Sequence, residues 1–182
     1  MKKILTGMLV LLTVQFANAQ SDDGYSFKKF KVDVSFGYAV PQGSGTKGGA
    51  ITVIEPKYAV LPEVSVGLRL EGAALANIDA SGNAGKITVL GSYLATGDYY
   101  FTSDRFRPFA GAGAGLYKSA SANMSNDYST VITPTTSQFG FMARAGFEFG
   151  HLRLGVEYNF LKQSQSYLGV KFGVCIGGGR IE

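Results

Sequence analysis

Ten charged residues stand at alternate positions in five segments of the chain, a spacing that could build a network of ion pairs. In an extended strand, alternate residues lie on the same face, so each segment would present its charges on one side. Charges that face an interior are costly unless they are paired and hydrogen-bonded. Five are positive and five are negative, which predicts mutual pairing; a charge-lined path for ions or small solutes is the alternative. The ten are Lys31, Asp33, Glu63, Arg69, Glu71, Arg144, Glu148, Arg153, Glu157 and Lys171.

Other residues with reactive side chains do not combine into a catalytic or metal-binding pattern. His151 is the only histidine and follows Gly150 at an expected tight turn, with no Asp, His or Cys cluster nearby in sequence. Cys175 is the only cysteine, so no internal disulfide is possible, and we interpret it as a small strand residue. The run from Gly111 to Gly115 lacks the spacing and the lysine of a phosphate-binding loop. We therefore predict no enzymatic activity, no cofactor and no metal site.

The segment 139–149, FGFMARAGFEF, indicates which element would position the charges. Its odd-numbered residues are four Phe and two Ala, and the residues between them include Arg144 and Glu148. This period of two is typical of a strand with one apolar and one polar face. The outer aromatic residues, Phe139/Phe141 and Phe147/Phe149, are eight residues apart, roughly 26 Å at about 3.3 Å per residue. Tilted by about 40°, this covers roughly 20 Å, near the height of a lipid-facing band between aromatic girdles.

Seven further segments complete a set of eight expected strands. Clear alternation also covers 31–40, 63–71, 151–160 and 167–176, whereas 50–59, 86–101 and 106–118 alternate less clearly. Pro56 within one of them cannot donate to a sheet ladder and predicts an irregularity there. The connections, at 41–49, 60–62, 74–85, 102–105, 119–136, 150 and 162–166, are mostly long and short in turn. An even strand number with short turns at one end and longer loops at the other is typical of bacterial outer-membrane barrels.

The first residues and the composition fit export to a membrane. Lys2 and Lys3, an apolar stretch from Ile4 to Val14 and the Ala17-Asn18-Ala19 site predict a cleaved secretory signal peptide over 1–19, with the barrel domain over 20–182. Charged residues are 16%, well below the roughly 25% of soluble domains. Removing the two lysines lowers the formal charge from +4 to +2, which argues against nucleic acid as a partner.

A secreted lipocalin-like barrel is the main alternative, because it also alternates, with its apolar face inward. Three features favour the membrane barrel instead. The polar face contains many glycines, which suit the narrow lumen of eight strands. Aromatic residues such as Tyr38, Tyr158 and Phe160 stand near strand ends on the apolar face, and charged residues are scarce.

The chain resembles the small eight-stranded outer-membrane β-barrel family of Gram-negative bacteria, OmpA/OmpX-like or porin-like. The motifs that carry the resemblance are VSVGLRLEG at 64–72, FAGAGAGLY at 109–117, AGFEF at 145–149, GVEYNF at 155–160 and LGVKF at 168–172. It implies a closed antiparallel up-and-down barrel in the outer membrane with both termini periplasmic. One family member is a lipid A palmitoyltransferase with a histidine near the outer surface, whereas His151 is expected at the opposite end. Such chains usually end on an aromatic residue, and this one ends GGGRIE, so Phe172 or Ile176 would have to serve in assembly.

Family likeness does not select a function, because its members include structural proteins, adhesins and resistance factors. We expect a structural or cell-surface interaction role with a lumen closed by paired charges; the alternatives are a narrow channel and a subunit of a larger envelope assembly. Expected partners are outer-membrane lipid and lipopolysaccharide, the barrel assembly machinery and an unidentified surface or envelope protein. A tight turn at Gly150 would place residues whose numbers sum to about 301 opposite each other. We therefore predict two cross-strand ion pairs, Arg144–Glu157 and Glu148–Arg153.

Overall fold

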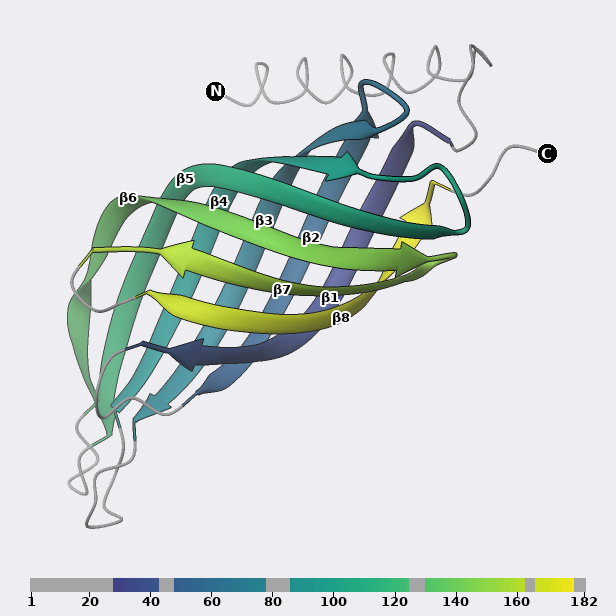
Figure 1. Cartoon of the computed structure of the whole chain (residues 1–182). Coiled ribbons are helices and arrows are strands. Elements are labelled where there is room, and N and C mark those ends of the chain that lie inside the picture. Colours follow the sequence, from purple (N-terminus) through teal and green to yellow (C-terminus); the bar gives the residue numbers. More distant parts are fainter. Residues whose placement is uncertain (1–27, 43–47, 78–85, 125–129, 163–165, 179–182) are drawn as a thin grey trace, which may run out of the picture.

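Eight antiparallel strands form one closed barrel in the computed structural model, which describes residues 28–42, 48–77, 86–124, 130–162 and 166–178. Consecutive strands pair with each other, and β1 pairs with β8 to close the sheet (Figure 1). The predicted all-β meander is confirmed. The strands are β1 (Phe30–Pro41), β2 (Gly49–Ala59), β3 (Val64–Asn77), β4 (Lys86–Tyr100), β5 (Phe106–Met124), β6 (Thr130–Phe149), β7 (Leu152–Phe160) and β8 (Tyr167–Gly177). The expected signal peptide at 1–19 and the last four residues lie outside the described residues.

Among the described residues there is no helix that could span a membrane.

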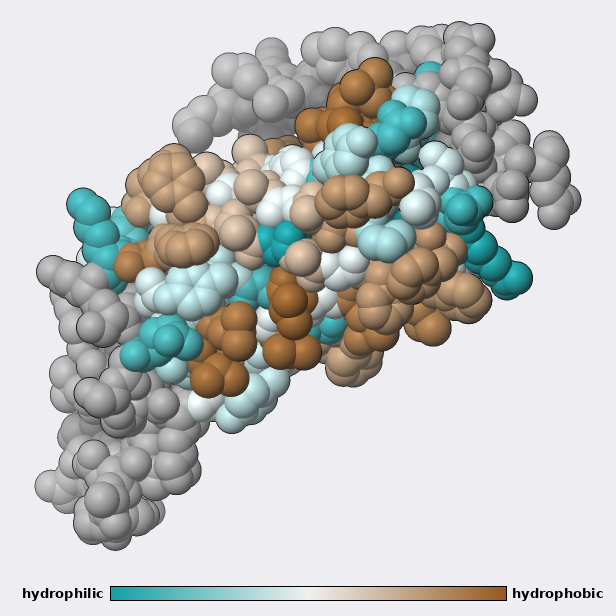
Figure 2. Space-filling model, viewed as in Figure 1, coloured by the Kyte–Doolittle hydropathy of each residue, from teal (hydrophilic) through white to brown (hydrophobic). Residues whose placement is uncertain are grey.

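The two faces of the sheet differ in polarity in the way that the alternation predicts. Outside the barrel, large apolar side chains are exposed: Leu68 is 66% exposed and Phe172 is 63% exposed. Inside, charged side chains are buried, and Arg69 is 0% exposed. Apolar side chains cover much of the visible outer face of the strands in Figure 2. A lipocalin-like barrel would have the reverse arrangement, whereas an apolar exterior of this extent suits hydrocarbon.

Two ends of the barrel are used as reference points below. The turn end contains the short connections 60–63, 101–105 and 150–151, and the loop end contains the connections that follow β1, β3, β5 and β7. At the turn end, Gly150 has a φ of 59°, a left-handed conformation that glycine adopts without steric cost. The predicted register of β6 against β7 is confirmed, since Arg144 lies opposite Glu157 and Glu148 lies opposite Arg153.

The strands β5 and β6 extend much further than expected, and the prediction of a loop over 119–136 is wrong. Their pairing continues to Met124 opposite Thr130, with a register shift between Ser119 and Ser121. Similarly, β3 pairs with β4 as far as Asn77 opposite Lys86. Figure 1 shows these hairpins passing beyond the neighbouring strands at the loop end. The segment reads as a loop because it is rich in Ser, Thr and Asn, but its strands lie beyond the apolar band and therefore carry no apolar alternation.

Candidate functional site

Eight charged side chains from five strands form one connected set of ion pairs in the half of the lumen nearer the turn end. We call this set the turn-side network. It contains four cations and four carboxylates, so its formal charge is zero. Its members are Lys31, Asp33, Glu55, Lys57, Asp98, Arg144, Glu148 and Arg153.

Asp98 on β4 is the centre of the turn-side network. Its carboxylate lies 2.6 Å from Lys57 Nζ, 2.7 Å from Arg144 Nε and 2.8 Å from Arg153 Nη2. Opposite it, Gly111 on β5 leaves the space that the carboxylate occupies: a Cβ at this position would stand 2.1 Å from Asp98 Oδ1. The missing side chain on β5 therefore allows three cations to meet one buried acid.

Arg144 also binds Glu55 through two parallel hydrogen bonds. Its Nη1 and Nη2 each donate to one carboxylate oxygen of Glu55 at 2.7 Å. Thr96 donates its hydroxyl to the same carboxylate at 2.6 Å. Bidentate arginine–carboxylate pairs are among the strong hydrogen bonds of proteins and fix the orientation of both groups.

Glu148 connects the network to the turn end. Lys31 Nζ lies 2.5 Å from its carboxylate, and Arg153 contacts the same oxygen. The Tyr100 hydroxyl donates to Glu148 at 2.7 Å and accepts from Lys31 at 2.7 Å. A tyrosine hydroxyl can donate and accept at once, so Tyr100 links the Glu148 carboxylate to the Lys31 ammonium group.

A second, smaller set of ion pairs lies nearer the loop end, and we call it the loop-side network. Arg69 binds Glu157 through two nitrogens, with Nη1 2.6 Å from Oε2, and also contacts Glu71 on its own strand. Lys171 contacts Glu157 from β8, and Tyr167 donates its hydroxyl to Glu71. Two cations face two carboxylates, so this network is neutral as well. Neutrality matters because a buried charge without a partner is strongly destabilising.

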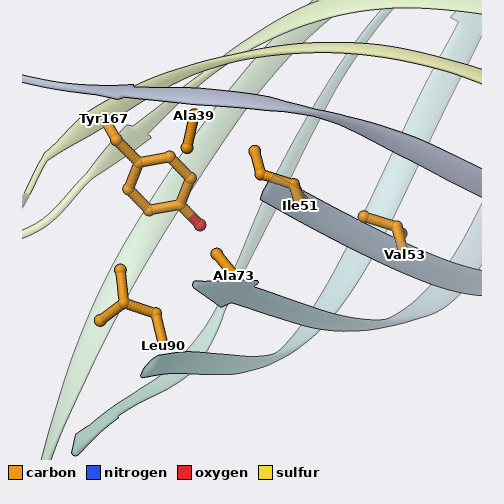
Figure 3. Packing of buried hydrophobic residues seen from close by; sticks show 6 residues of the cluster. All are labelled: Ala39, Ile51, Val53, Ala73, Leu90 and Tyr167. Atoms are coloured by element: carbon orange, nitrogen blue, oxygen red, sulfur yellow. The ribbon is translucent and has the colours of Figure 1, made fainter. Parts of the chain in front are cut away.

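Apolar side chains fill the lumen beside and beyond the loop-side network. Two clusters contribute, one around Tyr167 and one around Met142, and Leu161 packs against both. Figure 3 shows the first cluster projecting toward a common interior, and its residues belong to β1, β2, β3, β4 and β8. We call the nine buried residues the apolar layer: Ala39, Ile51, Val53, Ala73, Leu90 and Tyr167, with Leu94, Tyr117 and Met142. The lumen thus changes from charged to apolar along the barrel axis.

Nine of the ten charged residues predicted from the sequence lie in these two networks, and Glu63 does not. Glu63 is exposed in the turn 60–63, because the chain enters β3 only at Val64 and the alternation does not extend back to it. Three members escaped the sequence reasoning: Glu55, Lys57 and Asp98. These three residues stand at alternate positions of 50–59 and 86–101, which could have indicated them. Nearer the loop end, however, the same faces carry apolar residues, so neither face is uniformly polar along its strand. The apolar residues are Ile51, Val53, Leu90 and Leu94.

One of the two predicted ion pairs forms and the other is replaced. Arg153 contacts Glu148 as expected. Arg144 instead reaches across the lumen to Glu55 and Asp98, and Glu157 binds Arg69 and Lys171. The register of neighbouring strands therefore did not decide these partners, because in a closed narrow barrel a long side chain also meets the strands on the far side.

His151 and Cys175 lie together at the turn end. His151 is exposed, and its Nδ1 is 2.9 Å from the carbonyl oxygen of Cys175. The Cys175 thiol and the carboxylates of Asp33 and Glu148 place ligand atoms within 4.8 Å of one another. Lys57 and Lys31 already lie 2.6 and 2.5 Å from those two carboxylates, so the donor set suits ammonium groups rather than a metal ion.

Comparison with known proteins identifies relatives by family and by fold. A family model described as "Outer membrane protein beta-barrel domain" matches residues 7–175. The structure is similar to Ail, the attachment invasion locus protein of Yersinia pestis, with a TM-score of 0.56, 12% identity and coverage of 84% of this chain and 99% of Ail. It is also similar to Neisserial surface protein A, with a TM-score of 0.54, 17% identity and coverage of 84% and 97%. At these identities the likeness concerns the fold alone. No curated protein sequence matches the chain.

Proposed function

Because the chain belongs to the family of outer membrane protein beta-barrel domains, we propose that it is a non-enzymatic integral membrane protein with a structural or cell-surface interaction role. Its lumen is closed to solutes by the two ionic networks and the apolar layer. The observation that carries this proposal is the neutrality and burial of both networks. Arg69, Glu157 and Asp98 are buried on all sides and held by opposite charges, so they are unavailable for catalysis or for ion transport.

The loop end supports a role in surface interaction. The strand β7 ends at Phe160, which aligns with Phe141 of β6 and, through it, with Ala114 of β5. From Ala114 the strand β5 continues to Met124, roughly 33 Å further at about 3.3 Å per residue. The longer loops of such barrels face outward, so in our proposal this hairpin projects from the cell surface and both termini are periplasmic.

The partners proposed for the chain follow from the same surfaces. The exposed apolar band would contact outer-membrane lipid and lipopolysaccharide, and the barrel assembly machinery would insert the chain. The projecting strands would contact a surface or envelope protein. If that contact were permanent, the chain would be a subunit of a larger envelope assembly, which is the alternative function.

A narrow channel is the second candidate, and one observation favours it. A space with a water-accessible volume of about 20 Å³ lies between the two networks and is lined by residues that include Asp33, Arg144, Glu157 and Lys171. Polar spaces of this kind hold water when they are large enough. If side chains moved to join this space to both ends, small ions could pass.

Single-channel recording on refolded protein separates these functions. We expect no steady conductance from the wild type once insertion into the bilayer has been verified. A triple variant, Arg69→Ala/Glu157→Ala/Tyr167→Ala, keeps the net charge and removes one ion pair and one of the two tyrosine rings of the apolar layer. It should conduct more than the wild type and so shows that the assay can detect an opened lumen. A steady ionic current through the wild type would favour the channel.

A further inference from the structure

A basic pocket opens at the turn end of the lumen, next to the turn-side network, and shares Lys31 and Lys57 with it. Its water-accessible volume is about 20 Å³, and it is partly open to solvent. Five cations line it, and none of the described residues that line it is a carboxylate; Glu63 in the turn 60–63 is exposed but is not part of the lining. We call this pocket the basic mouth, and its polar lining includes Lys28, Lys29, Lys31, Lys57, Arg107 and Ser65.

Tyr100 gathers two of these cations at one point. The guanidinium carbon of Arg107 lies 4.1 Å from the centre of the Tyr100 ring, and Lys31 Nζ lies 4.8 Å from it. A cation over an aromatic face is stabilised by the ring electrons. Lys31 is already paired with Glu148 at 2.5 Å, so Arg107 is the cation of this pair that lies outside the turn-side network.

Ser65 provides a separate indication of a ligand. Its side chain is buried, with 4% of the residue exposed, and its hydroxyl has no hydrogen-bond partner in the protein. A buried polar group without a partner costs free energy, and such groups are uncommon in folded proteins. Because Ser65 is one of the residues that line the basic mouth, its hydroxyl would donate to a molecule held there.

We infer that the basic mouth binds a small phosphate-type oxyanion. A hydroxyl, ammonium groups and a guanidinium all supply donors to the pocket, and a phosphate has more acceptor oxygens to use them than a carboxylate. Ser65, Lys57 and Arg107 face the lumen rather than the lipid. This placement favours a soluble phosphate over the headgroup of a bilayer lipid, which has the same chemistry but lies outside the barrel wall. The inference does not depend on the proposed function.

Titration calorimetry with inorganic phosphate tests the site on wild-type protein refolded in a neutral detergent. We expect saturable binding of one phosphate per barrel, weakened by added salt because the attraction is electrostatic. Competition with phosphatidylglycerol in the same detergent distinguishes the sources: phosphate that remains bound indicates a soluble ligand, and displaced phosphate indicates a lipid headgroup at the same site. Absence of saturable phosphate binding to the wild type would overturn the inference.

Three variants locate the binding. Ser65→Ala should weaken phosphate binding about tenfold, the value of one hydrogen bond to a charged group. It should leave the barrel folded, because the hydroxyl has no partner in the protein to lose. Arg107→Gln should weaken binding at least as much. Lys118→Gln removes an exposed cation from the outer face of β5 and should change nothing. Equal losses in all three variants, or none in Ser65→Ala, would show that the phosphate binds elsewhere.

Discussion

Removing Arg69 should destabilise the barrel more than any exposed charge does, and removing one of its partners as well should restore part of the loss. Arg69 is 0% exposed and contacts Glu71 and Glu157, and Lys171 is the other cation of the loop-side network. The substitution Arg69→Met keeps an unbranched side chain of similar length and removes the charge. It leaves two buried carboxylates with one cation between them.

The magnitude follows from the burial of these groups. Breaking a buried ion pair by removing one partner costs about 3–5 kcal/mol. We expect about 3–4 kcal/mol for Arg69→Met and a similar loss for Glu157→Gln, each at the lower end because one opposite charge remains in the network. The double variant leaves Lys171 and Glu71, which are again neutral together. It should therefore lose about 4 kcal/mol, with a coupling energy of about 2–4 kcal/mol between the two sites.

A matched control separates local pairing from total charge. Arg69→Met combined with Glu148→Gln also restores the net charge of the lumen, but Glu148 belongs to the turn-side network. This combination should be additive within about 0.5 kcal/mol, as expected for residues with no shared partner.

Urea unfolding of protein refolded into lipid vesicles measures these free energies. The chain has no tryptophan, so the folded fraction is followed by gel mobility without heating and by circular dichroism. If Arg69→Met and Glu157→Gln were additive, or if the control combination recovered as much stability as the paired one, the reasoning from local ion pairs would be refuted.

Four further outcomes follow from the fold. A closed sheet hydrogen-bonds every strand and resists detergent, so unheated protein should migrate differently from boiled protein on a denaturing gel, and equal mobility after verified refolding would contradict the closed barrel. Ala145→Arg on the lipid face should cost about 2–4 kcal/mol near the bilayer midplane, as measured by urea unfolding. A spin label at position 145 should contact acyl chains and one at position 146 should not; the opposite result would reverse the two faces. In the apolar layer, Met142→Ala should cost about 2–5 kcal/mol of unfolding free energy because it leaves a cavity, whereas a loss below 1 kcal/mol would mean that the layer is loosely packed.

The sequence alone was sufficient for the architecture. In the segment 139–149 the period of two assigns Phe141 to the lipid and Arg144 to the lumen without any knowledge of neighbouring strands. The tight turn at Gly150 then determines the register of β6 against β7. Both properties are local, because alternation follows from backbone geometry and a two-residue turn leaves little choice of pairing.

Tertiary structure decided which charges meet. Glu55 and Asp98 became the partners of Arg144 only when closure of the sheet brought β2 and β4 across the lumen from β6. Their strands gave a weak signal, since the lumen face of each changes from apolar to charged along its length. A sequence pattern cannot identify such a face as polar, because its polarity is not uniform. The half nearer the loop end packs in the apolar layer, and the half nearer the turn end belongs to the turn-side network. Ion pairing in a barrel therefore depends on the distances between side chains across the closed interior. The register of neighbouring strands does not determine these distances.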